Sequence, residues 1–164
     1  MKDFDKNITR EAIDKATIEF SSLVYPLGFI HSKKWFWVRE KEASADFIHF
    51  HLDGISYRAP INYSVSFRVH CGNRNFNDSF EALALNGPYS RDSEALKRKY
   101  HHSFNAKSGS TYERCIEDLM KFVKDIGEPW FAIASFDTSN CQNTENLKLS
   151  RKLLGLKASK TNNT

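Results

Sequence analysis

The fold is decided by residues 23–38, which read LVYPLGFIHSKKWFWV. Pro26 disfavours helix at the residue before it, and Gly28 accepts the left-handed backbone that commonly follows a helix C-terminus. The run Trp35-Phe36-Trp37 is rich in the aromatic residues that strands favour. The stretch therefore predicts a helix that ends at about Gly28 and a sheet that begins with an aromatic strand.

Upstream of this stretch, apolar residues recur at steps of three and four, which is the pattern of an amphipathic helix. Thr9 is a good N-cap, because its hydroxyl can accept a hydrogen bond from an otherwise unpaired backbone N–H. We therefore expect a helix that begins at Thr9 and buries one apolar stripe, formed by Ile13, Ala16, Phe20, Val24 and Leu27.

Downstream, residues 35–41, 46–53 and 61–71 alternate in character with a period of two. This alternation is typical of antiparallel strands with one face covered and the other wet. Short turns are expected at residues 43–44, at 53–54 and at 72–73, where small, polar and glycine residues gather.

In the second half, residues 91–104 fit either a charged helix or a helix start that gives way to a strand at about 100–104, and we favour the second. Another helix is predicted from Thr111 to Gly127, with a short helical turn after it at Pro129. The whole indicates an α+β domain over residues 1–154, with helices packed on one face of an antiparallel sheet of about four to six strands. Residues 155–164 are small, polar and basic, and we expect a disordered tail there.

The bulk composition excludes several classes of protein. The chain has 164 residues, a net charge of +4 and three widely spaced cysteines without a C-x-x-C pair. We therefore expect neither a disulfide framework nor a cysteine-rich zinc site. The cysteine pattern is typical of a protein of the reducing cytoplasm. We expect neither a signal peptide nor a membrane span, because the N-terminus lacks an apolar segment and no apolar run approaches about 20 residues.

Histidines are the sharpest candidates for chemistry. His49 and His51 lie two apart on a predicted strand, so their side chains point the same way and could share a metal, with His70 from the next clear strand as a third ligand. No serine-nucleophile, phosphate-loop or H-E-x-x-H motif accompanies them. We therefore predict no catalytic residues, no metal and no cofactor, and we lean against an enzyme. A small metal-dependent enzyme that uses His49, His51 and His70 is kept as the alternative.

Binding is the preferred class of function. One candidate surface is the Trp35 and Trp37 face; the other is the wet face of the sheet, with Arg39, His49, His51, Arg68 and His70. An aromatic patch with a polar, basic rim suits a protein partner. The same aromatics flanked by lysines could also stack on bases, so a nucleic-acid-binding domain is a further alternative. The oligomeric state cannot be predicted.

Residues 25–39, which read YPLGFIHSKKWFWVR, resemble the opening of a family of bacterial proteins of unknown function numbered 4304. Residues 64–69 (SVSFRV) and 126–131 (IGEPWF) resemble a strand and a helix-to-Pro-Trp-Phe element of the same family. The resemblance implies a bacterial cytoplasmic protein with this order of elements and no established activity. By analogy with other small α+β domains, a role like that of immunity or regulator proteins is an expectation.

Overall fold

The structure is a computed structural model, and it describes residues 2–41, 44–52, 63–75, 84–91 and 93–133. Several sequence predictions lie outside these residues. They are the turn at residues 53–54, the first residues of the strand predicted from 61, the end of the domain at 154 and the tail at 155–164.

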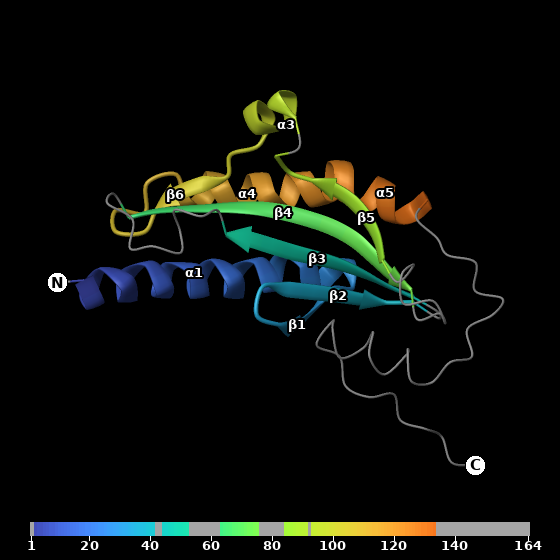
Figure 1. Cartoon of the computed structure of the whole chain (residues 1–164), viewed down its shortest axis with the longest axis horizontal. Coiled ribbons are helices and arrows are strands. Elements are labelled where there is room, and N and C mark those ends of the chain that lie inside the picture. The colour runs from blue at the N-terminus through green and yellow to red at the C-terminus, as the bar shows by residue number, and fades with distance from the viewer. Residues whose placement is uncertain (1, 42–43, 53–62, 76–83, 92, 134–164) are drawn as a thin grey trace, which may run out of the picture.

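The protein is an α+β domain whose sheet has six antiparallel strands, as predicted. Five strands follow each other in the order β1-β2-β3-β4-β5, and β6 pairs separately with β4. Figure 1 shows the long helix α1 and the chain of helices from α4 to α5 running along the curved sheet. The strands are β1 Ile30–Lys33, β2 Phe36–Glu40, β3 Ser44–Leu52, β4 Ser64–Asn75, β5 Ala84–Tyr89 and β6 Ser103–Asn105. The helices are α1 Lys2–Val24, α3 Glu94–Lys99, α4 Tyr112–Phe122 and α5 Glu128–Ile133.

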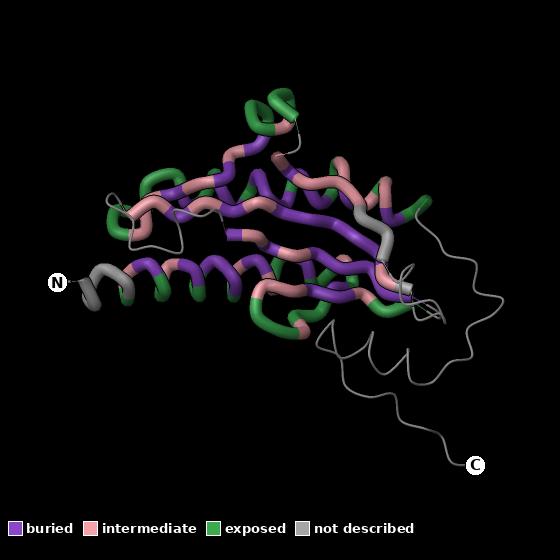
Figure 2. Tube along the Cα trace, in the orientation of Figure 1, coloured by how far each residue is buried: buried purple, intermediate pink, exposed green. Residues whose placement is uncertain are grey.

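One face of the sheet forms the core together with α1, α4 and α5. Figure 2 shows buried residues along β3, β4 and one side of α1. The predicted alternation of β3 and β4 is confirmed, because their apolar sets point into this core and the histidines of β3 point away from it. The largest fully buried side chains are Trp37, Tyr100, Phe20, Phe29, Phe50, Phe67, Phe122 and Phe131.

Helix α1 begins earlier than predicted. It runs from Lys2, so Thr9 is not an N-cap but a helical residue that is 5% exposed. The predicted end is confirmed: a 3-10 turn at Tyr25–Leu27 follows α1, and Gly28 then adopts φ 93° and donates its N–H to the Tyr25 carbonyl. Glycine reaches this left-handed conformation at no steric cost.

The aromatic stretch forms a hairpin rather than a single strand. β1 pairs with β2, and Trp35 lies in the turn between them with φ 65°. Trp35 is therefore not a strand residue, and β2 begins at Phe36.

The turn predicted at Gly72 is wrong, because β4 continues through it to Asn75. Gly72 is paired with Phe47 on β3, and a Cβ at position 72 would lie only 2.2 Å from the Phe47 ring. The glycine thus leaves room for an aromatic ring from the neighbouring strand, and this is why it stands inside a strand.

The second half follows the favoured prediction for residues 91–104, with α3 first and β6 after it. The predicted stop at Gly127 is wrong. A π-helical stretch, Val123–Gly127, joins α4 directly to α5. A Cβ on Gly127 would lie 3.0 Å from the Cys71 sulfur, so this glycine allows helix and sheet to approach closely. Within the described ranges, none of the helices has the length and apolar character needed to cross a membrane.

Candidate functional site

Four aromatic side chains form a row on the face of the sheet that points away from the helices. The strand register pairs Phe36 with His49, His49 with His70, and His70 with Tyr89, so the row crosses β2, β3, β4 and β5. We call this surface the open face because it points away from the helices, but it is not the wet face that the sequence predicts: Val38, Ala45 and Phe47 on it are buried and form a second core cluster. His51, two residues along β3 from His49, lies beside the row on the same face.

The outer members of the row stack on the histidines next to them. The ring centroids are 4.1 Å apart for Phe36 and His49, and 4.0 Å apart for Tyr89 and His70, with interplanar angles of 18° and 3°. Phe47 adds an edge-to-face contact to His70 at 5.4 Å, from the position that Gly72 opens. Packing against rings on both sides restricts the orientations of these imidazoles.

Three imidazoles converge at the centre of the open face. The Nδ1 of His49 lies 2.9 Å from the Nε2 of His51, and each of the three histidines contributes one ring nitrogen to a group whose members all lie within 4.8 Å of one another. His49 and His51 are half-buried and His70 is buried. Of the residues that the structure describes, these three form the one such group of histidine, cysteine or acidic side chains.

The protonation state of His49 suits metal binding. Burial, the largest cause, together with charge repulsion from His51, His70, Lys33 and Arg68, lowers the pKa of His49 to about 3. The His49 imidazole is therefore neutral at physiological pH, which is the form that ligates a metal. One of the two rings, His49 or His51, donates its N–H to the other.

The spacing fits a small metal ion after a limited adjustment. At Zn–N distances of about 2.0–2.1 Å, two nitrogens of a tetrahedral site lie roughly 3.4 Å apart. Two nitrogens at the 4.8 Å limit of the group would move about 1.4 Å closer, and the His49–His51 pair, at 2.9 Å, would move about 0.5 Å apart. Binding at both paired nitrogens also requires the donor ring to carry its proton on its other nitrogen.

Arg39, predicted for the same surface, lies on the opposite face of the sheet. Its Nε and Nη2 donate to the Asp46 carboxylate at 3.0 and 2.9 Å, and its Nη1 donates to the Leu27 carbonyl and to Glu128 of α5. Lys41 also pairs with Asp46 at 3.1 Å, and the Asn73 amide donates to it at 2.8 Å. We call this group the Asp46 network.

The Asp46 network is a structural unit with balanced charge. The Asp46 side chain is fully buried, and cations surround it. Burial acts to lower the pKa of Arg39, but its bonds to Glu128 and Asp46 raise that pKa above the ordinary value. The guanidinium also lies over the rings of Phe29 and Phe131. Arg39 therefore ties β2 and β3 to α5, and its strand alternation with Trp37 was the signal that it faces the core.

The two tryptophans of the predicted stacking platform are separated by the hairpin. Trp37 is fully buried, packs edge-to-face on Phe20 and donates its indole N–H to Ser21 of α1. Trp35 is half-buried in the turn, with the Lys34 ammonium 4.6 Å from its ring centre. The two tryptophans do not share one accessible surface. Trp37 is therefore not available for base stacking, and of the two predicted rings only Trp35 is.

Two site residues were missed because neither is a metal ligand. Phe36 and Tyr89 flank the histidines. An aromatic residue on a strand gives no indication in the sequence that it lies beside a polar cluster. The signal for Phe36 was its alternation with Trp37, which placed it on the face of His49. Tyr89 could not be found in this way, because its strand was not predicted.

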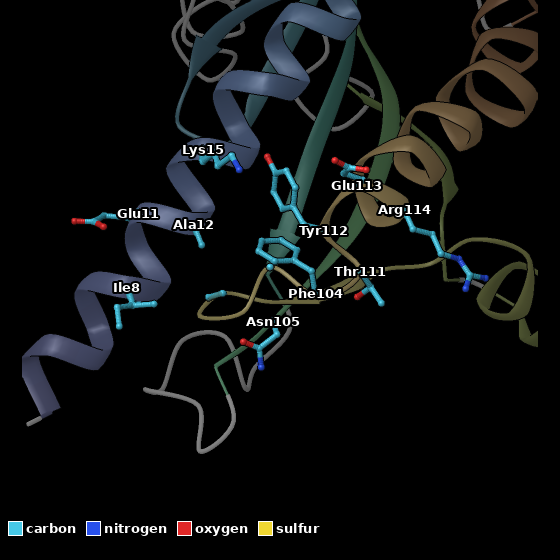
Figure 3. Close-up of a pocket in the computed structure, with 12 residues that line it drawn as sticks. Ile8, Glu11, Ala12, Lys15, Phe104, Asn105, Thr111, Tyr112, Glu113 and Arg114 are labelled. Atoms are coloured by element: carbon cyan, nitrogen blue, oxygen red, sulfur yellow. The ribbon is translucent and has the colours of Figure 1, made fainter.

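A pocket of about 660 Å³ opens elsewhere, between α1 and the segment from β6 to α4. Figure 3 shows Lys15 and Tyr112 facing each other across it. The Lys15 ammonium lies 4.4 Å from the Tyr112 ring centre, and the Tyr112 hydroxyl donates to Glu19. These contacts join α1 to α4.

The two described cysteines are buried and chemically quiet. Burial raises the pKa of the Cys115 thiol to about 12 and raises that of Cys71 as well. Both therefore remain protonated and poorly nucleophilic, in agreement with the sequence interpretation.

Comparison of the chain with protein-family models, curated proteins and solved structures finds no match. The resemblance to family 4304 accordingly stays a prediction, as do the bacterial and cytoplasmic assignments. The site must be interpreted from its own geometry.

Proposed function

We propose that this protein binds a divalent transition-metal ion, with zinc as the first candidate, through His49, His51 and His70. The observation that carries the proposal is the convergence of three ring nitrogens from two neighbouring strands within 4.8 Å. The sequence analysis favoured a module without a metal and kept this site as the alternative. Convergence is what that alternative required, so we favour a metal site over a module without a metal.

Imidazole nitrogen is a ligand that zinc, copper, nickel and iron all accept. Three protein ligands leave one position of a tetrahedral zinc ion for water or substrate, which is the arrangement of catalytic zinc sites, whereas structural sites use four. The proposed site is therefore of the open kind. A binding module and a metal-dependent enzyme both remain compatible with it.

The competing interpretation is a purely structural cluster of aromatic rings. In that case the stacking of Phe36 on His49 and of Tyr89 on His70 would be the whole purpose of the row. The two interpretations differ in one measurable respect, because only a ligand site gains stability when metal is added.

The test is thermal unfolding of the protein, without a polyhistidine tag, in chelator and with added zinc, cobalt or nickel. A ligand that binds only the folded state at 100 times its Kd stabilises that state by about 2.7 kcal/mol. For a chain of this length the expected rise in Tm is about 5–10 °C.

Two variants assign the effect to the site. We expect His51→Ala to remove the rise in Tm, because His51 supplies one of three ligands and is only half-buried. His31→Ala is the matched control: His31 is exposed on β1 and lies outside the group, so the rise should persist. An unchanged Tm with all three metals, or an equal rise in His51→Ala, would contradict the proposal.

A further inference from the structure

The pocket between α1 and the segment from β6 to α4 has the size and the lining of a small-molecule site. Its volume of about 660 Å³ lies within the range of such sites, roughly 300–1,000 Å³. Phe104 and Tyr112 contribute aromatic rings to its wall, and Glu11, Lys15 and Glu113 are among the charged side chains there. The pocket thus combines an apolar wall with charges that can select a ligand.

The two aromatic rings meet at a right angle and are held in place. The ring centroids of Phe104 and Tyr112 are 4.9 Å apart, with an interplanar angle of 88°. Phe104 also packs on Phe67 of β4 at 6.2 Å, and the Tyr112 hydroxyl donates to Glu19 of α1 at 2.5 Å. Burial and this bond raise the pKa of Tyr112, so the phenol stays protonated and keeps the bond. The aromatic corner is therefore formed before a ligand arrives.

The Tyr112 ring already carries a cation, which belongs to the chain itself. The Lys15 ammonium lies 4.4 Å from the ring centre, and Figure 3 shows the two side chains facing each other. An aromatic face attracts a cation in this geometry. Lys15 is exposed and has a flexible four-carbon stem, so its ammonium can move into solvent at little cost. A ligand cation can therefore take over the position above the ring.

Carboxylates outnumber cations around this position. A second hollow, of about 470 Å³, adjoins the pocket, because Glu11 and Lys15 line both. Glu11 and Glu19 lie one helical turn before and after Lys15, on the same side of α1. The charged side chains that line the two hollows are four carboxylates and two cations: Glu11, Asp14, Glu19, Glu113, Lys15 and Arg114. The surface around the aromatic corner therefore favours a ligand of positive charge.

We infer that this pocket binds a small organic cation, an ammonium group on an aromatic or apolar body, with the ammonium over Tyr112 in place of that of Lys15. The apolar body would lie against Phe104, and the carboxylates of α1 would balance the charge. The same carboxylates disfavour an anion, and a neutral ligand would leave the position over the ring to Lys15. The inference does not depend on the metal site, which lies on the face of the sheet that α1 and α4 do not cover.

The experiment is a titration of the ¹⁵N-labelled protein, followed by the shifts of its backbone amide signals at constant ionic strength. Benzyltrimethylammonium and benzylamine, which is protonated at pH 7, are added in separate arms, so a quaternary ammonium is distinguished from one that donates hydrogen bonds. Benzyl alcohol is the neutral control with the same ring. We expect saturable shifts at Lys15 and Tyr112 in at least one ammonium arm, with a Kd about 10-fold below that of benzyl alcohol.

Variants at exposed positions test the exchange of one cation for another. Lys15→Gln should lower the Kd of the ammonium ligand about 5-fold, because it removes the competing cation and its repulsion. Glu19→Gln should raise the Kd about 3-fold, because it removes a carboxylate beside the ring. Arg10→Gln is the matched control: Arg10 is exposed on the same helix but lines neither hollow, so the Kd should stay within about 2-fold.

Three results would overturn the inference. They are the absence of saturable shifts at Lys15 and Tyr112 with both ammonium compounds, a Kd for benzyl alcohol as low as theirs, and a Lys15→Gln variant that binds no more tightly than the wild type. Tyr112→Leu should abolish binding, and should it fail to fold, Lys15→Gln still decides the question. Far-ultraviolet circular dichroism checks that each variant keeps the fold.

Discussion

The β3–β4 pair carries two polar clusters, one on each face, and the two clusters differ in how their charges are arranged. In the Asp46 network, a fully buried carboxylate receives hydrogen bonds or ion pairs from Arg39, Lys41 and Asn73. On the open face, His49, His51 and His70 are flanked by the cations Lys33 and Arg68. The first cluster pairs its carboxylate with cations of the same chain, while the group of three histidines includes no acidic side chain of the described residues.

The difference separates a group that holds the fold from one that is suited to a ligand. Breaking a buried ion pair leaves an uncompensated charge in a medium that solvates it poorly, and this costs about 3–5 kcal/mol. Removing one of the cations beside the histidines relieves charge repulsion instead. The same type of substitution should therefore have very different effects in the two clusters.

The largest effect is expected for Asp46→Asn. The substitution removes the carboxylate shared by Arg39 and Lys41, and we expect a loss of about 3–5 kcal/mol in the free energy of unfolding, measured by urea denaturation. Glu94→Gln is the control, because the exposed Lys97–Glu94 pair should contribute less than about 1 kcal/mol. A loss for Asp46→Asn as small as that of the control would show that the network does not hold the fold.

Next in size is Arg39→Gln. Asp46 would keep Lys41 and Asn73, but the bridge to Glu128 of α5 would be lost. The expected loss is about 2–3 kcal/mol in the same measurement. Because Arg39 joins the sheet to α5, hydrogen exchange should also become faster in α5. Unchanged exchange there would mean that the ion pair contributes nothing to docking of the helix.

A smaller effect concerns the pH dependence of the metal-free protein. The pKa of His49 is about 3 in the folded state and ordinarily about 6.5, so the unfolded chain binds the proton more readily. Stability is therefore full above about pH 6.5 and falls as the pH drops toward 3. Between pH 7 and 5 the full difference would cost about 2 kcal/mol; for a half-buried group we expect about 1 kcal/mol.

The measurement is urea unfolding in chelator at several pH values, for the wild type and for His49→Gln. The variant cannot take up this proton, so its stability should depend less steeply on pH over the same range. Parallel curves for the two proteins would show that His49 does not carry the effect.

The smallest effect is expected for Arg68→Gln in the metal-free protein, and it completes the comparison with Arg39→Gln. The substitution removes a cation–π contact with Tyr89, which stabilises by about 0.5 kcal/mol at a partly exposed site, and it also removes repulsion within the cluster. We expect the free energy of unfolding to change by no more than about 0.5 kcal/mol. A loss comparable to that of Arg39→Gln would make the open face structural.

Much of the fold could be predicted because strand alternation is a local signal. The patterns around Ile48 and Val69 placed the histidines of β3 and β4 on one face correctly, since successive side chains of a strand point to opposite sides. What the patterns do not contain is register. His49 lies opposite His70 because of how the two strands are offset, and a shift of one residue would have sent one of them into the core.

Other errors arose where packing overrides local preference. Gly72 was taken for a turn residue, because glycine usually marks turns, whereas it makes room for Phe47. Trp35 was placed in a strand by its aromatic character, although it occupies a left-handed turn. Arg39 was assigned to the wet face because it is charged; its partners Asp46 and Glu128 could not be known before the strands and α5 were positioned.

The π-helical stretch between α4 and α5 keeps a repeating pattern in phase. Buried residues recur every fourth position, at Cys115, Leu119, Val123, Gly127 and Phe131. In a regular α-helix each step of four overshoots a full turn by about 40°, so the last member would have rotated well away from the sheet. The wider π-helical turn takes up this excess. If the same residues formed a regular α-helical turn instead, α5 would be rotated by about one residue step, roughly 100°. Glu128 would then leave Arg39, although neither residue had been altered. The length of this one turn thus determines which residues of α5 face the sheet.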